Sequence, residues 1–107
     1  MLYCFKSKAA ADVIMMADSA EAVLRLMGRD PAPQGILEAA ALPGYIQQLE
    51  AGVAEDEAQF QRQVEEAQAA GEPPPRRHGV TLRQRAWPLR DLMQRSLKYN
   101  ADVVWGV

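Results

Sequence analysis

The residues of this chain that are best suited to bind a ligand are the basic residues that follow the three prolines at positions 73–75. Guanidinium groups bind phosphate and carboxylate in a bidentate manner, and clusters of basic residues supply much of the non-specific affinity of proteins for nucleic acid. Trp87 and Tyr99 lie in the same segment and have rings on which bases can stack. The candidate ligand-binding residues are Arg76, Arg77, Arg83, Arg85 and Arg90.

Acidic residues dominate the segment that precedes this basic one. Residues 38–72 contain eight acidic residues and one arginine, whereas residues 76–98 contain seven basic residues and one aspartate. If both segments are helical and pack antiparallel, their charges meet within one molecule, and each exposed pair contributes about 0.2 to 1 kcal/mol. We therefore favour pairing within the chain over binding of an external anion. The sequence pI of about 5.3 also argues against a dedicated nucleic-acid-binding protein.

The residues that build catalytic or metal sites are scarce. His78 is the only histidine and Cys4 the only cysteine, so one chain cannot assemble a two-histidine or two-cysteine metal site. We expect His78 in an exposed loop and Cys4 as a small packed side chain of a strand. Neighbouring carboxylates such as Glu65 and Glu66 point to different sides of a helix and do not converge for acid–base chemistry. We predict no catalytic residue, no metal and no cofactor.

Length and composition indicate one domain that spans residues 1–107. With 107 residues, of which 49% are hydrophobic, the chain can bury one core but not a core plus a large enclosed cavity. It contains no stretch of about 18 apolar residues that would form a transmembrane helix, and no membrane partner is expected. The first residues show no charged segment leading into an apolar one, so we expect no secretory leader and a cytoplasmic protein.

Short apolar runs at both ends of the chain predict strands. Leu2–Ser7 and Asp12–Met16 are rich in aromatic and aliphatic residues, and we interpret them as a hairpin linked by residues 8–11. Residues 101–107 contain three valines and a tryptophan without helical periodicity, which predicts a closing strand. The order of the strands in the sheet does not follow from the sequence, although a strand this apolar would be sheltered best beside the first one.

A helix and a loop are predicted after the hairpin. Asp18 and Glu21 fit a capping box for a helix over residues 19–27, with Gly28 at the left-handed C-cap position. Two prolines and a glycine then break any periodicity and predict a loop over residues 29–35.

Two longer helices are predicted in the second half of the chain. Thr81 and Gln84 form a second capping box, at the start of a helix over residues 82–99 that we expect Pro88 to bend. The longest amphipathic pattern ends at the proline-rich segment 71–75. Its apolar stripe consists of Ile46, Leu49, Val53, Phe60 and Val64.

These elements together predict an α+β fold. A small antiparallel sheet, made from the N-terminal hairpin and the C-terminal strand, packs with about three helices, including an acidic and a basic helix separated by a proline-rich turn. Both faces of each strand are apolar, whereas the strands of a sheet with one solvent-exposed face alternate apolar with polar side chains. We therefore expect a second cover on the sheet, either a helix on each face or another copy of the protein.

Several blocks of the sequence resemble a known family. The blocks are Met1-Leu2-Tyr3, Phe5-Lys6-Ser7-Lys8-Ala9, Asp30-Pro31-Ala32-Pro33-Gln34-Gly35, Arg83-Gln84-Arg85-Ala86-Trp87-Pro88 and Val104-Trp105-Gly106-Val107. They resemble a family of small bacterial proteins, mainly proteobacterial, that is catalogued only as a domain of unknown function. The resemblance covers essentially the whole chain. It implies a stand-alone cytoplasmic protein and supplies no catalytic residue, ligand or mechanism.

We predict a non-enzymatic cytoplasmic protein that associates with itself, as a homo-oligomer, or with another protein. An apolar sheet face or the apolar stripe of the long helix would form the contact. The alternative is a protein that binds a phosphate-bearing ligand or nucleic acid through the five arginines named above. Phosphate binding weakens steeply with added salt, whereas an apolar interface does not. An enzyme would require an oligomer interface that brings residues from two chains together.

Overall fold

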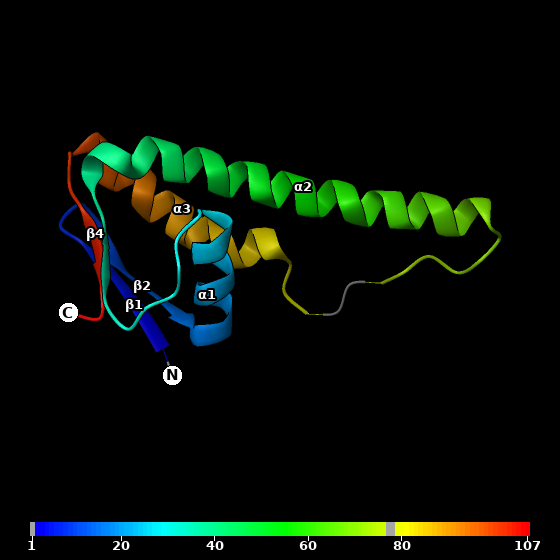
Figure 1. Cartoon of the computed structure of the whole chain (residues 1–107), viewed down its shortest axis with the longest axis horizontal. Helices are drawn as coiled ribbons and strands as arrows, with labels where there is room; N and C mark the ends of the chain where they lie inside the picture. Colours follow the sequence, from blue (N-terminus) through cyan, green and yellow to red (C-terminus); the bar gives the residue numbers. More distant parts are fainter. Residues whose placement is uncertain (1, 77–78) are drawn as a thin grey trace.

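The computed structural model describes residues 2–76 and 79–107, and these form two layers (Figure 1). One layer is a four-stranded antiparallel sheet, and the other consists of three α-helices that cover one face of it. The α+β fold predicted from the sequence is confirmed. The elements are β1 (Leu2–Ser7), β2 (Ala10–Met16), α1 (Ala17–Leu26), β3 (Gly35–Leu37), the 3-10 helix η1 (Ala39–Ala41), α2 (Leu42–Ala69), α3 (Leu82–Lys98) and β4 (Val103–Trp105).

The sheet has the strand order β2-β1-β4-β3. β4 pairs antiparallel with β1, with Phe5 opposite Trp105, which is the position in which the sequence suggested that the closing strand would be sheltered best. The sequence does not predict β3, and the loop predicted over residues 29–35 is wrong at its last residue, because Gly35 pairs with Trp105. A strand of three residues is too short to show an alternating pattern.

The N-terminal hairpin turns more tightly than predicted. Ser7 pairs with Ala10, so the turn consists of Lys8 and Ala9 alone, and Ala10 and Ala11 belong to β2. The Ala9 amide donates a hydrogen bond to the Ser7 hydroxyl at 3.2 Å within this turn. The longer link predicted from the sequence is therefore wrong. Alanine has a weak preference for strands, so Ala10 and Ala11 give no sequence signal that β2 begins at Ala10.

Helix α1 follows β2 without a linker. It begins at Ala17, and its N-cap is Met16, whose side chain makes no capping hydrogen bond, so the predicted cap at Asp18 is wrong. The Asp18 carboxylate instead accepts a hydrogen bond from the Ser19 amide at 2.8 Å, in the first turn, where a negative charge interacts favourably with the helix dipole. The predicted glycine at the other end is confirmed, since Gly28 has a φ of 76°.

Helices α2 and α3 form an antiparallel pair (Figure 1). α3 begins with the predicted capping box, in which the Thr81 hydroxyl accepts from the Gln84 amide and the Gln84 side chain accepts from the Thr81 amide. The helix continues through Pro88, so the Gln84 carbonyl lacks the amide partner of a regular helix. The molecule measures 52 × 28 × 22 Å because α2 extends well past the sheet, and no residue of α2 after Val53 is buried.

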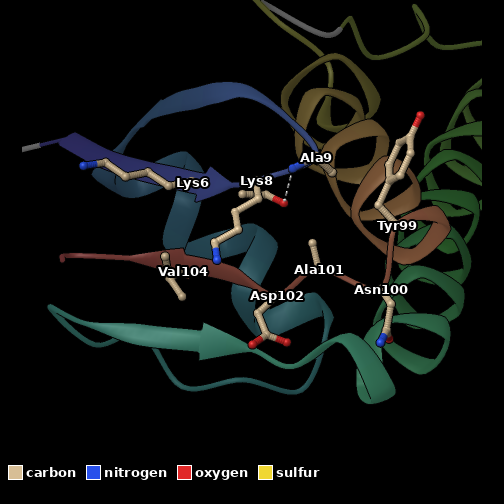
Figure 2. Close-up of a pocket in the computed structure, with 9 residues that line it drawn as sticks. Lys6, Lys8, Ala9, Tyr99, Asn100, Ala101, Asp102 and Val104 are labelled. Carbon is tan, nitrogen blue, oxygen red and sulfur yellow. Dashed lines mark hydrogen bonds between the residues drawn. The ribbon is translucent and has the colours of Figure 1, made fainter.

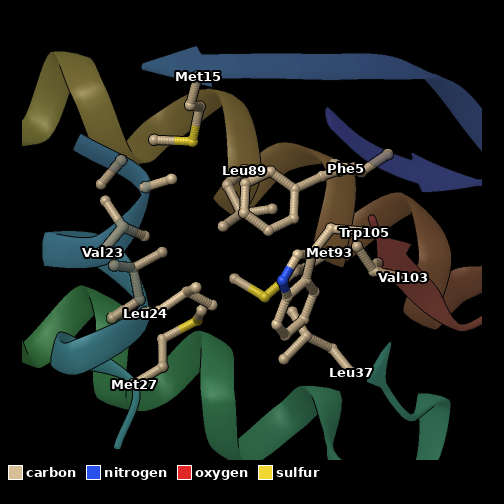
Figure 3. Close-up of a cluster of buried hydrophobic side chains, with 14 of the residues drawn as sticks. Phe5, Met15, Val23, Leu24, Met27, Leu37, Leu89, Met93, Val103 and Trp105 are labelled. Carbon is tan, nitrogen blue, oxygen red and sulfur yellow. The ribbon is translucent and has the colours of Figure 1, made fainter. Parts of the chain in front are cut away.

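The core lies between the helices and one face of the sheet (Figure 3). Alternate residues of the strands point into it, among them Phe5 and Trp105. Leu24 from α1, together with Leu89 and Met93 from α3, packs against these rings, and each of the three is fully buried. One contiguous cluster of apolar side chains therefore holds the sheet to all three helices.

Tyr3 lies at the edge of this core and connects β1 to α1. Its side chain is 6% exposed, and its hydroxyl donates a hydrogen bond to the Glu21 carboxylate. Burial raises the pKa of the hydroxyl, the charge of Glu21 and the hydrogen bond raise it further, and Arg25 lowers it. The hydroxyl is therefore held in its protonated form as a donor.

Trp105 connects the sheet to the loop before β3. Its indole Nε1 donates to the Ala32 carbonyl at 2.9 Å, and its ring lies against Gly35, where a Cβ atom would overlap the ring carbons. The Arg29 guanidinium lies 5.6 Å from the centre of the indole ring and donates to the Ile36 carbonyl at 2.8 Å. One tryptophan and one arginine therefore hold this loop and β3 against β4.

The other face of the sheet is not covered by a helix in the part of the chain that the structure describes. The side chains of Leu2, Ile14 and Met16 lie on this face and are 60%, 64% and 61% exposed. The expectation of a helix on each face is therefore wrong, because the buried residues of all three helices pack in the same cluster as Phe5 and Trp105.

Replacing Gly35 by alanine should destabilise the fold, because the new Cβ atom would overlap the buried indole of Trp105. Overpacking a core costs about 1 to 3 kcal/mol, and we expect the free energy of unfolding, measured by urea denaturation, to fall by about this amount. The control is Gly44→Ala in α2, since nothing lies within 4 Å of a Cβ atom added there. Equal stability of the two variants would contradict the packing described for Trp105.

Candidate functional site

Two of the predicted arginines contact Trp87 on α3. The guanidinium carbon of Arg83 lies 4.3 Å from the centre of the Trp87 ring, and that of Arg90 lies 4.9 Å from it. Residues three and four positions apart share one side of a helix, which explains why both reach the same ring. The half-buried indole therefore makes cation–π contacts with both arginines.

Both arginines also pair with acidic residues of α2. Arg90 Nε lies 3.0 Å from Glu50 Oε1, and Arg83 binds both carboxylate oxygens of Glu57, with its Nε 3.3 Å from Oε2. The hydrogen bond to Glu57 raises the pKa of the Arg83 guanidinium. The predicted pairing of the acidic and basic helices within one chain is confirmed at these positions.

The other predicted arginines do not join this cluster. Arg85 is exposed and lies two residues from Arg83, which places it on a different side of α3. Arg76 is exposed in the proline-rich turn. Arg77 and His78 lie outside the described residues. The structure thus brings two of the five arginines together, and binding of a ligand by the set stays a prediction.

The uncovered face of the sheet is the second candidate site. The register of β1 and β2 places Leu2 opposite Met16 and Cys4 opposite Ile14. Cys4 is half-buried, and its Sγ lies 3.7 Å from Asp12 Oδ2 on the same face. Cys4 therefore points away from the core on the same side as Leu2, as strand alternation predicts, and the expectation of a packed Cys4 side chain is wrong because no helix covers this face among the described residues. We define the open face as Leu2, Cys4, Lys6, Asp12, Ile14, Met16, Ile36 and Val104.

A cavity lies at one end of the open face, where the hairpin turn meets the segment between α3 and β4 (Figure 2). Sequence reasoning missed this site, because its residues come from the two ends of the chain and form no motif in either. The pairing of β1 with β4 brings them together. The cavity has a volume of about 770 Å³ and is lined by Lys6, Ser7, Lys8, Ala9, Tyr99, Asn100, Ala101, Asp102 and Val104.

The sequence matches one protein family along almost its whole length. The model of the family described as "Domain of unknown function (DUF1840)" matches residues 1–105. The chain belongs to the DUF1840 family. The resemblance seen in the sequence blocks is thereby confirmed, and the description of DUF1840 names no activity or ligand. No curated protein and no solved structure matches the chain.

The long helices of this DUF1840 chain are polar on their outer sides. Within residues 2–76 and 79–107, none of the helices is long and apolar enough to cross a membrane. The distal half of α2 carries an exposed ion pair, in which Arg62 Nη2 lies 3.1 Å from Glu55 Oε1. This pair differs from those that join α2 to α3, because both of its members belong to one helix.

The contact between α2 and α3 should depend measurably on Arg90 and Glu50. Their side chains are 24% and 41% exposed, so solvent screens this pair only in part. A double-mutant cycle of R90Q and E50Q, read by urea unfolding, should give a coupling free energy of about 0.5 to 1 kcal/mol that shrinks with added salt. For Arg62 and Glu55, 57% and 71% exposed, we expect almost no coupling. Equal coupling in the two cycles would contradict a special role of Arg90.

Proposed function

We propose that this DUF1840 protein is a non-enzymatic, cytoplasmic module that forms a homodimer through the open face of its sheet. The observation that carries the proposal is the exposure of Leu2, Ile14 and Met16, which are 60%, 64% and 61% exposed and lie on adjacent strands. Large apolar side chains that gather on one surface are typical of interaction sites. A single cysteine, which forms no disulfide within the chain, supports the cytoplasmic location.

The apolar residues form a continuous patch over β1 and β2. Leu2 is opposite Met16, and Cys4 is opposite Ile14, so two successive cross-strand pairs on this face are without charge. A face in permanent contact with water would carry polar side chains at these positions. Burying such a patch is favourable by about 25 cal/mol for each Å² of apolar surface removed from water.

A second copy of the chain fits this surface because the charges of the open face complement each other. Lys6 and Asp12 are its charged residues, one of each sign, and both lie towards the hairpin turn. A two-fold axis that runs parallel to the strands, between β1 and β2, places β1 of one copy over β2 of the other. Lys6 then faces Asp12 of the partner subunit, and Leu2 faces Met16 of the partner subunit.

The arginines are less well placed for the alternative role, the binding of nucleic acid or a phosphate-bearing ligand. Arg83 and Arg90 are paired with Glu57 and Glu50, so an external anion would have to displace a carboxylate that the fold holds in place. Arg76 and Arg85 form no ion pair with the described residues, but they lie on different elements, and two separate guanidinium groups do not make a phosphate-binding patch.

Sedimentation velocity over a range of concentrations tests the proposal. The full chain should form a dimer, and the double variant I14T/M16Q should raise the dissociation constant by about tenfold or more, because each apolar side chain is lost from both copies. The matched control is V80T, since Val80 is 54% exposed before α3 and the change likewise converts a β-branched apolar residue into threonine. Circular dichroism verifies that both variants fold.

A wild-type chain that stays monomeric, or an I14T/M16Q variant that dimerises as strongly as V80T, would overturn the proposal. Absorbance at two wavelengths in the same runs reports any nucleic acid that accompanies natively purified protein. A monomer that carries nucleic acid and releases it in high salt would favour the arginine-based alternative instead.

A further inference from the structure

The cavity at the hairpin end of the open face shares Lys6 and Val104 with that face, but the hairpin turn and residues 99–102 that line it take no part in the proposed dimer contact. Its walls are the hairpin turn on one side and residues 99–102 on the other, and Val104 of β4 also lines it (Figure 2). The proposed two-fold axis runs between β1 and β2, whereas this cavity lies beside β4. The site is therefore complete within one chain, and the inference below does not rest on self-association.

Hydrogen bonds fix both walls of the cavity. On the hairpin side, the hydroxyl oxygens of Ser7 and Ser96 are 2.7 Å apart, which ties the turn to α3. On the opposite side, Asp102 Oδ1 accepts a hydrogen bond from the Ala39 amide at 2.8 Å, which ties this segment to η1. A site whose walls are already fixed loses less conformational entropy when a ligand binds.

The aromatic ring of Tyr99, the C-cap residue of α3, lies beside the cavity. The chain leaves the helix through Asn100, which has a left-handed φ of 53°, and the Ala101 amide donates to the Ser96 carbonyl at 2.8 Å. Tyr99, the residue before this turn, is 66% exposed. A tyrosine ring that solvent reaches over most of its surface is a platform on which another planar ring can stack.

Lysines supply most of the charge of the cavity. Lys8 extends from the hairpin turn across β4, whereas Lys6 extends along β1 (Figure 2) and its Nζ donates to the main-chain oxygen of Val107 at 3.2 Å. Lys8 forms no ion pair with any of the residues that the structure describes. Asp102 is the acidic residue of the lining, and the Ala39 amide occupies one of its two oxygens.

We propose that this cavity binds a small organic anion in which a planar ring carries one acidic group. The ring stacks on Tyr99, and the acidic group accepts a hydrogen bond from the Lys8 ammonium. The volume of about 770 Å³ is typical of small-molecule sites. Lys6 is engaged with Val107, so Lys8 supplies the one ammonium group available to a ligand, which matches a carboxylate better than a doubly charged phosphate.

NMR titration of the isotope-labelled full chain tests this proposal with four probes. Benzoate has the ring and one charge, benzamide has the ring without the charge, acetate has the charge without the ring, and phenyl phosphate has the ring with a higher charge. Benzoate should shift the amide signals of the hairpin turn and of residues 99–102. Benzamide and acetate should bind about tenfold more weakly or worse, because each lacks one of the two contacts.

The variants K8Q and Y99L should each weaken benzoate binding about tenfold. R85Q is the matched control, because Arg85 is an exposed basic residue of α3 that does not line the cavity, and the benzoate affinity of this variant should equal that of the wild type. Lys8 and Tyr99 are exposed, so the spectra of the variants should show an intact fold.

Three results would overturn the proposal. The first is an unchanged benzoate affinity in K8Q or Y99L, the second an equal loss in R85Q, and the third a preference for phenyl phosphate, acetate or benzamide over benzoate. A repeat of the titration with I14T/M16Q separates this proposal from the dimer. Binding that survives there supports a site within one chain, and binding that disappears there contradicts it.

Discussion

The burial of the Trp105 indole is the constraint on which the rest of the fold depends. Its strand lies between β1 and β3, and the ring is 1% exposed, with its centre 5.7 Å from that of Phe5 and its surface against the backbone of Gly35. Its one polar atom is satisfied by the Ala32 carbonyl, which removes the cost of burying an unpaired donor. The Trp105 side chain therefore joins β1, β3 and the loop before β3 to the core. Its burial fixes the face of the sheet on which the helices pack.

Because all three helices pack on one face of the sheet, the opposite face stays exposed to solvent. Three helices cover one face of the sheet, and the opposite face keeps Leu2, Ile14 and Met16 in contact with solvent. This open face has two parts with different chemistry. The β1–β2 part is apolar with one charge of each sign, which suits a second copy of the chain, and the β4 end carries a cavity that Lys8 and Tyr99 line, which suits a small anion. The two parts share Lys6, but Lys8 and Tyr99 lie outside the β1–β2 contact, so both parts can be occupied together.

The sequence was most informative where the signals are local. The capping box at Thr81 and the long amphipathic pattern predicted α3 and α2 because a helix depends on residues within a few positions of one another. Prediction failed where contacts between residues far apart in the sequence determine the structure. The strand β3 forms because Gly35 pairs with Trp105 of β4 and fits against its ring. The segregation of charge predicted that the acidic and basic helices pair. Which arginines form ion pairs depends on how each helix is rotated about its own axis, and this rotation could not be predicted. The cavity was beyond prediction, since Lys8 and Tyr99 come to line one site only after β1 has paired with β4.

The contact of two copies through β1 and β2 is the central claim, and an isotope-filtered NMR experiment on a mixture of labelled and unlabelled chains tests it most directly. Such a spectrum reports only contacts between different copies. We predict signals that connect the methyl groups of Ile14 with Leu2 and Cys4 of the partner subunit. Signals confined to α2 or α3, or no signals under conditions in which the protein sediments as a dimer, would contradict the claim.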